Sequence, residues 1–500
     1  MAATFMEVLD TTVVNVSLPH IAGNLSASTD ESTWVLTSYL VANAVVLPAT
    51  GWLSNFFGRK RFLISCIVLF TMASVLCGAA SSLTMLIIAR CVQGAGGGAL
   101  QPISQAVLLE SFPPAKRGVA MAVFGLGVVV APIVGPTLGG WITDNYSWRW
   151  IFYINLPIGA LAIFLCMRFL QDPPWVRRVK EATIDYIGFG LLLLWIASLQ
   201  VILDKGQQED WFASNLIRAL AIVAVPALVG FIVWELWVDH PIVNLRVLSN
   251  RNFALGTILM TAMGMVLYGS TALLPLFLQT LLGYPALQSG MTVSPRGFGS
   301  IVAMIFVGRM IGRIDQRYMM MFGFGLLGVS TYRLSQLNLD IAWTNVMWPN
   351  IFNGLAMGFI FVPLSTTSMG TLPNEQIGAA AGIYNLMRNL GGGVGISLVT
   401  TLLARGAQTH QVTLVQHVNQ YNPAYQQHAS MLSHVLGSIG GTFPPRVLGV
   451  LYAQVLRQAN LLSFMDDFRM MGVLALVCVP GVMFFRRVRA RGGAAAAAAH

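Results

Sequence analysis

Charged residues are scarce in this chain of 500 residues, since only 10% are Asp, Glu, Lys or Arg while 56% are hydrophobic. Soluble domains carry about 25% charged residues, so this composition excludes an ordinary soluble protein. The sequence also lacks a GxxxxGK(S/T) phosphate loop, which argues against ATP as an energy source. Its cysteines fall in apolar runs, without the spacing of a disulfide framework or a metal site; they are Cys66, Cys77, Cys91, Cys166 and Cys478.

Long apolar runs are what the sequence has instead. A helix needs about 20 apolar residues to cross the hydrocarbon core of a bilayer. Such runs predict an all-α integral membrane protein with fourteen transmembrane helices. They lie near 1–21, 33–57, 62–81, 83–110, 118–143, 148–170, 184–203, 214–238, 253–282, 288–311, 318–337, 344–370, 376–403 and 466–486. Only nine residues precede Asp10, so the first span is short, which leaves room for residues missing before Met1.

The basic residues indicate the orientation of these helices. A net charge of +10 would suggest nucleic acid only if the basic residues gathered on a soluble face. Eighteen of the 29 lie instead in alternate short loops and at the C-terminal end, so we expect no nucleic-acid partner. Basic residues favour the cytoplasmic side, and this predicts that both termini are cytoplasmic. The eighteen are Arg59, Lys60, Arg61, Lys116, Arg117, Arg168, Arg177, Arg178, Lys180, Arg246, Arg251, Arg309, Arg313, Arg317, Arg486, Arg487, Arg489 and Arg491.

Glycine and proline positions recur at a nearly constant offset along the chain. Gly94 and Gly135 are 41 positions apart, and so are Gly354 and Gly395. Each residue of this kind in the second part of the chain lies 256–260 positions after its counterpart in the first part. This offset indicates two six-helix halves in parallel repeat. We expect an N-terminal half over 1–170, two inserted helices with flanking loops over 171–252, a C-terminal half over 253–487 and a cytoplasmic tail over 488–500. This arrangement places a substrate site between the halves, near the midplane of the membrane.

Asp10 is the most informative residue, because it is an acid inside a hydrophobic helix. A carboxylate at that depth costs about 2.5–3.5 kcal/mol on insertion scales, so one that is kept there usually moves protons or pairs with a cation. Arg90 lies in the fourth span and would stabilise the ionised form of Asp10 if it faced the first span, or would only hold two helices together. Glu7 lies on the same helical face and is a second candidate for proton coupling, unless its place near the N-terminus leaves it in water.

A stripe of small residues follows in the fifth span, where it allows helices to pack closely and bend. It consists of Gly135, Pro136, Gly139 and Gly140. Several polar side chains within the spans are candidates for a substrate cavity between the halves. They are Tyr39, Asn43, Gln93, Gln101, Asn385 and Arg388.

Four segments together resemble signatures of the major facilitator superfamily. GWLSNFFGRKRFL resembles its loop 2–3 motif, IIARCVQGAGGGAL its helix-4 Arg motif and GLGVVVAPIVGPTLGG the helix-5 motif of antiporters. LDTTVVNVSLP is similar to the helix-1 signature of fourteen-helix drug:proton antiporters, and PPAKR, WELWVDHPIV and SNRNF resemble EmrB-type permeases. One departure is Asn55, where the loop 2–3 motif commonly has an acid.

The resemblance implies a proton-driven multidrug efflux antiporter in the cell inner membrane, a protein of antibiotic resistance that exports lipophilic and cationic drugs. It implies no enzymatic activity and no cofactor, since a proton gradient drives transport. By the same resemblance, Gly51, Leu53, Gly58 and Arg59 control conformational change together with the stripe of the fifth span. The alternative is a proton-coupled exporter of one endogenous metabolite on the same fold.

Residues 404–465 are expected to form a long periplasmic loop. Its four histidines, His410, His417, His428 and His434, show no regular ligand spacing, so no metal site is expected. Residues 447–462 have the pattern of an amphipathic helix that could lie on membrane lipids or face a partner. EmrB-type permeases work with a periplasmic adaptor (membrane fusion) protein and an outer-membrane channel, so the resemblance implies that this loop contacts the adaptor.

Overall fold

The computed structural model describes residues 1–113, 116–172, 185–311, 313–419, 421–435 and 445–486. Within these ranges the chain is helical, and the only extended pairing is an isolated bridge between Ile311 and Ile314. Some residues used to predict orientation lie outside the described ranges, namely Arg177, Arg178, Lys180, Arg487, Arg489 and Arg491. The predicted tail over 488–500 lies outside them as well.

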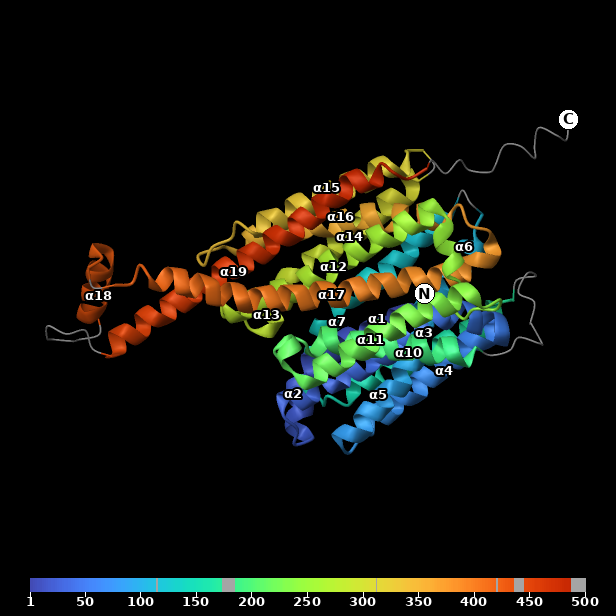
Figure 1. Ribbon diagram of the computed structural model, residues 1–500, viewed down its shortest axis with the longest axis horizontal. Coiled ribbons are helices and arrows are strands. Elements are labelled where there is room, and N and C mark those ends of the chain that lie inside the picture. Colours follow the sequence, from blue (N-terminus) through green and yellow to red (C-terminus); the bar gives the residue numbers. More distant parts are fainter. Residues whose placement is uncertain (114–115, 173–184, 312, 420, 436–444, 487–500) are drawn as a thin grey trace.

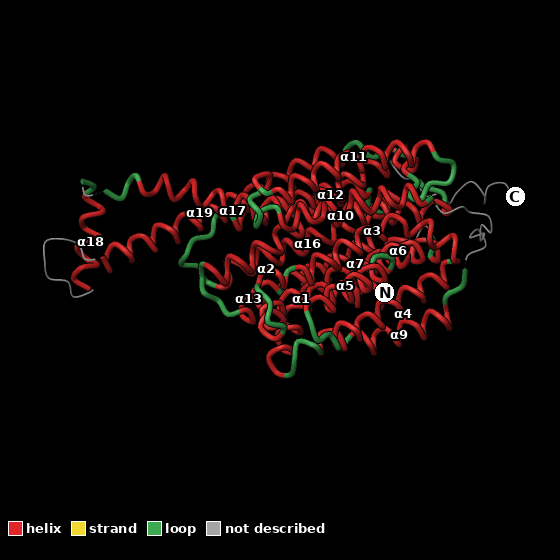
Figure 2. Tube along the Cα trace, turned by 60° about the horizontal axis from the view of Figure 1, so that its bottom comes forward, coloured by secondary structure: helices red, strands yellow, loops and turns green. Residues whose placement is uncertain are grey.

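The helices pack side by side in one elongated bundle (Figure 1, Figure 2). The N-terminal half contains α1 (Ala2–Asn24), α2 (Thr29–Ser32), α3 (Trp34–Phe57), α4 (Arg59–Gly78), α5 (Leu83–Gly97), α6 (Leu100–Ser111), α7 (Arg117–Asn145), α8 (Trp150–Tyr153) and α9 (Asn155–Phe169). The inserted region contains α10 (Tyr186–Lys205), η2 (Trp211–Ala213), α11 (Asn215–Trp237) and η3 (Leu245–Ser249). The C-terminal half contains α12 (Arg251–Thr280), α13 (Ala286–Val293), α14 (Pro295–Met310), α15 (Gln316–Leu334), α16 (Trp343–Met369), α17 (Asn374–Val415), α18 (Pro423–Val435) and α19 (Pro445–Val482).

Eleven helical segments of the described residues are long and apolar enough to cross a membrane. Some of them join two helices, such as α5 with α6 over Leu83–Ser111. The helices α1, α15 and α19 are not among the eleven, although all three pack within the bundle. Polar side chains such as Glu7 and Asp10 in α1 make these helices less apolar. The count of fourteen spans therefore stays a prediction.

Glycines hold equivalent helix pairs together in the two halves. Gly94 of α5 lies against the backbone of Tyr39 in α3, and Gly354 of α16 lies in the same way against the backbone of Arg296 in α14. Both partners follow the offset of the sequence repeat, since Arg296 comes 257 positions after Tyr39. A side chain at either glycine would collide with backbone atoms, so the repeat in the sequence is a repeat of close helix contacts.

The stripe of the fifth span forms the corresponding contact between α7 and α1. Gly135 lies against Thr12, and a Cβ placed on Gly139 would lie 2.9 Å from the carbonyl oxygen of Val13. Gly140 has more room, because a Cβ there would lie 3.8 Å from the nearest atom, Cγ1 of Val16. Pro136 lies inside the same helix. The stripe therefore fixes α1 closely against α7, within two turns of Asp10.

The halves meet at the end of the bundle that carries the turn between α3 and α4, here called the Arg59 end. A Cβ on Gly51 of α3 would lie 2.6 Å from the Cα of Ala379 in α17. On the other side of the bundle, a Cβ on Gly118 of α7 would lie 2.7 Å from a methyl carbon of Ile311, just after α14. The halves are thus closed against each other at this end by two helix pairs, α3 with α17 and α7 with α14.

The inserted helices lie on the outside of the seam between the halves. α10 packs on α3 of the first half and also touches α17 of the second. Its last turn is fixed to the start of α3, because Asp204 accepts a hydrogen bond from Thr37 and Lys205 donates one to Thr33. The Lys205 ammonium also lies 5.4 Å from the centre of the Trp34 ring. The inserted helices are therefore anchored mainly on the N-terminal half.

The segment 404–465 is mostly helical rather than a loop, and the helix predicted over 447–462 lies within α19. α17 continues to Val415, and α19 begins at Pro445, so both spans extend as helices beyond the bundle, with α18 across their tip (Figure 1). The 42 residues of α17 span about 60 Å, twice the hydrophobic thickness of a membrane. We call this extension, α17 from 404 onward with α18 and α19 up to 465, the helical hairpin, and its end of the bundle the hairpin end.

Two matched substitutions test the contact between α1 and α7. Gly139→Ala puts a methyl group against the backbone of Val13, and such overpacking costs about 1–3 kcal/mol. Gly140→Ala meets only ordinary van der Waals distances, so it serves as the control. We expect a lower melting temperature of the purified protein for Gly139→Ala alone. Equal melting temperatures for the two variants would show that the stripe is not tightly packed.

Candidate functional site

Asp10 is completely buried in the middle of α1, and three donor side chains from two other helices surround it. Its Oδ2 accepts a hydrogen bond of 2.5 Å from Nη1 of Arg90 in α5. Its Oδ1 accepts from Nε2 of Gln93 at 2.9 Å and from Nδ2 of Asn155, the first residue of α9, at 2.8 Å. The ion pair with Arg90 and the hydrogen bonds from the two amides together replace the water that the carboxylate has lost. These contacts explain how α1 keeps the acid at this depth.

Arg90 is also completely buried and is held from several sides. Its Nε donates to the carbonyl oxygen of Val35 at 3.1 Å, and its Nη1 also donates to Gln93 at 2.7 Å. The guanidinium lies over the ring of Tyr39, with 4.1 Å between Cζ and the ring centre. Its Nη2 has no hydrogen-bond partner among the described residues, so the Tyr39 ring adds a cation–π contact to the ion pair with Asp10. Arg90 thus joins α1, α3 and α5 around one charge.

Glu7 lies one turn before Asp10 and has its own set of partners. Nδ2 of Asn43 donates to its Oε1 at 3.1 Å, and the Tyr39 hydroxyl donates to the same atom at 3.4 Å. Nε2 of Gln101 in α6 donates to its other oxygen. The side chain is buried rather than wet, so the alternative of a solvated acid near the N-terminus is wrong.

Two amide side chains of α6 connect this site to the second half. Gln101 accepts through Oε1 from Nη2 of Arg388 in α17, while its Nε2 donates to Glu7. One turn further along α6, Oε1 of Gln105 accepts from Nδ2 of Asn385 at 2.7 Å. We call these two contacts the α6–α17 ladder. The acid in α1 and the cation in α17 are therefore linked across the boundary between the halves through a single glutamine.

The loop 2–3 motif closes the Arg59 end with an ion pair that the sequence analysis missed. Arg59 is buried and pairs with Glu110 in the last turn of α6, whereas Asn55 is exposed. Glu110 thus supplies a carboxylate although Asn55 replaces the usual acid of the motif. Gly58 has φ of 84°, a conformation that favours glycine and allows the sharp turn from α3 into α4. Leu53 packs against two hydrophobic clusters, one within the N-terminal half and one that extends across both halves.

The residues predicted to line a substrate cavity are buried and hydrogen-bonded. Gln93 donates a hydrogen bond to Asp10. Glu7 accepts hydrogen bonds from Tyr39, Asn43 and Gln101. Asn385 and Arg388 belong to the α6–α17 ladder. Their role in binding a substrate stays a prediction. Asn155 and Ser74 were missed, and Ser74 accepts from both Asn155 and Gln93. Ser74 was not distinguishable in the sequence, because its apolar run also contains Ser65 and Thr71.

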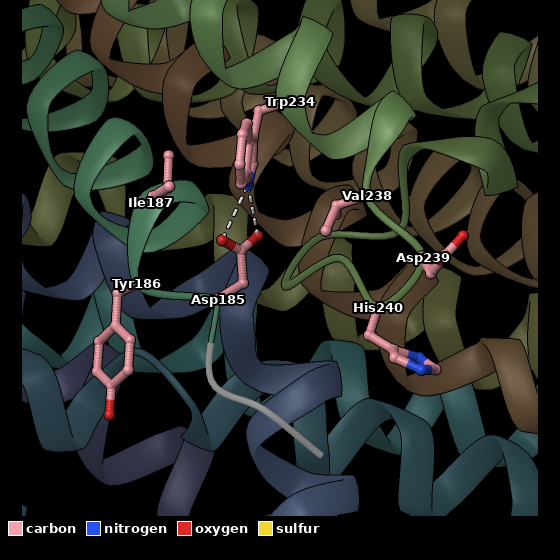
Figure 3. A pocket seen from close by; sticks show the side chains of 7 residues that line it. All are labelled: Asp185, Tyr186, Ile187, Trp234, Val238, Asp239 and His240. Carbon is pink, nitrogen blue, oxygen red and sulfur yellow. Dashed lines mark hydrogen bonds between the residues drawn. The ribbon is translucent and has the colours of Figure 1, made fainter.

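A separate pocket of about 420 Å³ opens between the two inserted helices (Figure 3). Trp234 of α11 donates through Nε1 to both carboxylate oxygens of Asp185, at 2.9 and 3.0 Å. The pocket is lined by Asp185, Tyr186, Ile187, Trp234, Val238, Asp239 and His240. None of these residues comes from α1, α5 or α17, so this pocket is not part of the site around Asp10, and the Asp185–Trp234 contact fixes α10 against α11.

Comparisons with known proteins agree with this architecture. The family profile described as Major Facilitator Superfamily matches residues 1–396. The chain is 38% identical to the multidrug export protein EmrB of Escherichia coli (strain K12), over 100% of this chain and 96% of that protein. It is 39% identical to the fatty acid resistance protein FarB of Neisseria gonorrhoeae, over 96% of this chain and 93% of that protein.

A solved structure supports the fold alone. The crystal structure of the human organic anion transporter MFSD10 superposes with a TM-score of 0.58 at 14% sequence identity. The match covers 95% of this chain and 98% of that one.

A double-mutant cycle tests whether Asp10 and Arg90 act as a pair. Removing one partner of a buried ion pair costs about 3–5 kcal/mol, because the other charge stays buried without compensation. We therefore expect Asp10→Asn and Arg90→Gln each to lower the melting temperature strongly, and the double variant to lose much less than their sum.

The same cycle on Asp466 and Arg469 is the control, because their side chains are 53% and 54% exposed and such pairs contribute about 1 kcal/mol or less. Additive losses for Asp10 and Arg90, like those at the exposed pair, would contradict the coupling.

Proposed function

Because the chain belongs to the major facilitator superfamily, a family of membrane transporters, we propose that it is a proton-coupled antiporter that exports lipophilic drugs. The observation that supports this most directly is the buried Asp10–Arg90 pair. A proton on Asp10 cancels the carboxylate charge and weakens its hold on Arg90, so protonation and helix contacts depend on each other. Relatives named for multidrug export support the direction of transport and the breadth of substrates. The relative named for fatty acid resistance adds lipophilic acids to the range.

Two routes connect the charge on α1 to the contact between the halves. The first runs through the glycine stripe, since α1 packs on α7 and α7 packs on α14 of the second half. The second runs from Glu7 through Gln101 to Arg388 of α17. A change in the position of α1 on protonation would therefore reach both helix pairs that close the Arg59 end. This is the alternation between two packed states that transport requires.

The proposed setting is the cell inner membrane, with the Arg59 end toward the cytoplasm. The basic residues at that end, such as Arg59 and Arg117, follow the positive-inside rule, and both termini would be cytoplasmic. The helical hairpin would then project into the periplasm, where a periplasmic adaptor and an outer-membrane channel would complete a tripartite system. Its length beyond the bundle is in keeping with contact to a partner outside the membrane.

Only part of the apolar face of the predicted amphipathic helix over 447–462 is exposed on the hairpin. Val447 and Leu451 are buried under α18, so they are not available to a partner. Leu448 and Tyr452, one turn apart on α19, are 47% and 54% exposed. We therefore assign adaptor contact to the face of the helical hairpin that carries these two residues.

The proton-coupling role of Asp10 is tested by transport in proteoliposomes with an imposed pH gradient. Asp10→Asn keeps the shape of the side chain but cannot carry a proton, so proton-driven efflux of a fluorescent lipophilic drug should be abolished. Asp144→Asn changes an acid whose side chain is 70% exposed and should transport normally. Full-rate, gradient-dependent efflux by Asp10→Asn would refute the proposal.

The docking role of the hairpin is tested by two substitutions that leave the membrane part intact. Leu448→Asp combined with Tyr452→Asp should abolish co-purification with the adaptor and drug resistance of intact cells, but spare transport in proteoliposomes. Gln458→Asp, an exposed polar position on the same helix, should change none of these. If the double variant loses transport in proteoliposomes, the hairpin belongs to the transport pathway; if it changes nothing, this face is not the docking surface.

A further inference from the structure

Arg388 differs from the other buried arginines of the described residues because two of its nitrogens have no acceptor, whereas it shares the lack of a carboxylate within 4.0 Å with Arg296. Arg59 and Arg90 form ion pairs with Glu110 and Asp10. Arg296 donates through Nη1 and Nη2 to the hydroxyls of Thr271 and Ser270, at 2.9 and 3.1 Å. Arg388 is only 1% exposed, yet within the described ranges no carboxylate lies within 4.0 Å of it.

The partners that Arg388 does have are neutral amides, and they use only one of its nitrogens. Nη2 donates to Oε1 of Gln101 and, at 3.4 Å, to Oδ1 of Asn389. Nε and Nη1 have no hydrogen-bond partner among the described residues. A buried cation whose donors lack acceptors destabilises the folded protein, because a charge away from water is unfavourable without compensation. The nearest acid on this network, Glu7, lies on the far side of Gln101.

A second free donor lies on the neighbouring rung of the α6–α17 ladder. Gln105 is completely buried, and its Nε2 has no partner in the part of the chain that the structure describes, while its Oε1 accepts from Asn385. Gln105 comes four positions after Gln101, and Asn385 comes three before Arg388, so both rungs lie on the same facing sides of the two helices. Free donors from an arginine and an amide therefore lie close together at the boundary between the halves.

The free donors of Arg388 and Gln105 match a carboxylate, although the same rung also carries an acceptor without a partner among the described residues, Oδ1 of Asn385. A carboxylate accepts several hydrogen bonds, and it supplies a negative charge in direct contact, which Arg388 lacks within the described ranges. We propose that Arg388 and Gln105 form a subsite for the carboxylate of a lipophilic acid. The subsite is covered in the closed arrangement described above and becomes accessible when α6 and α17 separate. This assignment rests on the proposed export function and names one substrate class for it.

Occupation of this subsite also affects the acid in α1. Gln101 holds Arg388 through its oxygen and Glu7 through its nitrogen. A carboxylate bound at Nε and Nη1 neutralises the charge that Arg388 now shares with the Gln101 oxygen through Nη2, which weakens that hydrogen bond and the link between the halves. Arg388 is in this way both a specificity determinant for anions and a connection to the groups around Glu7.

The test compares two probes that differ only in charge, pyrenebutanoate and its uncharged primary amide. The acid is ionised at pH 7.5, since carboxyl groups titrate near pH 4. Binding to the full chain in nanodiscs is followed by pyrene fluorescence, with empty nanodiscs as the blank. Arg388→Gln should weaken binding of the acid by about tenfold or more and change the binding of the amide by less than about threefold. Arg388→Lys keeps the positive charge and should retain part of the affinity for the acid.

Arg296→Gln is the matched control, because it removes another buried arginine from the same half and should leave both affinities unchanged. Equal weakening of acid and amide by Arg388→Gln, or equal loss of acid binding in Arg296→Gln, would overturn the subsite. Binding is measured without a proton gradient, so its outcome is independent of the Asp10→Asn transport test. A selective loss in Arg388→Gln alongside gradient-independent efflux would keep the subsite and refute proton-coupled export.

Discussion

A carboxylate in the centre of a membrane helix has to be compensated from every side, and the N-terminal half is arranged around this requirement. Asp10 receives Arg90, Gln93 and Asn155, so α5 and α9 converge on α1. Ser74 of α4 supports two of these donors, and the ring of Tyr39 in α3 covers the guanidinium. All members of this cluster compensate one charge, so a single proton affects them together. Neutralising Asp10 weakens the hydrogen bonds that hold every other member in place.

Close packing through glycine allows these polar contacts to form without empty space. Gly135 and Gly139 bring α1 against α7, and Gly94 brings α5 against α3. At such distances a small displacement of one helix cannot be absorbed by side chains and moves the neighbouring helix instead. The second half repeats the same contacts, with Gly354 and Gly395 in place of Gly94 and Gly135. Helices on both sides of the boundary are therefore coupled by the same kind of close glycine contact.

Much of this architecture could be predicted from the sequence, for definite physical reasons. An acid and an arginine within apolar runs have to find each other or water, so Asp10 and Arg90 were recognisable as a candidate pair, and the structure brings them into contact. The offset between glycines indicated the repeat, because only close backbone contacts fix glycine at regular positions. Asn155 and Glu110 were not recognisable, since a single polar residue near a span end has several possible roles until the facing helix is known. In the hairpin, the helix over 447–462 was predicted, whereas α18 and the continuation of α17 were missed because their polar composition resembles that of a loop.

The two acids of α1 have different surroundings, although only one helical turn separates them. All the donors to Asp10 come from the first half, so a change in its charge directly alters helix contacts within that half. Glu7 also has donors from the first half, but Gln101 extends its network to Arg388 in the second. A transporter that alternates between two states needs one group that senses the proton and another that senses whether the halves are closed. Because both acids lie on the same rigid helix, a displacement of α1 on protonation of Asp10 also displaces Glu7 and pulls on the α6–α17 ladder. Under the proposed function, the spacing of these two residues would connect proton binding at Asp10 to the contact between the halves through the hydrogen bonds of Gln101.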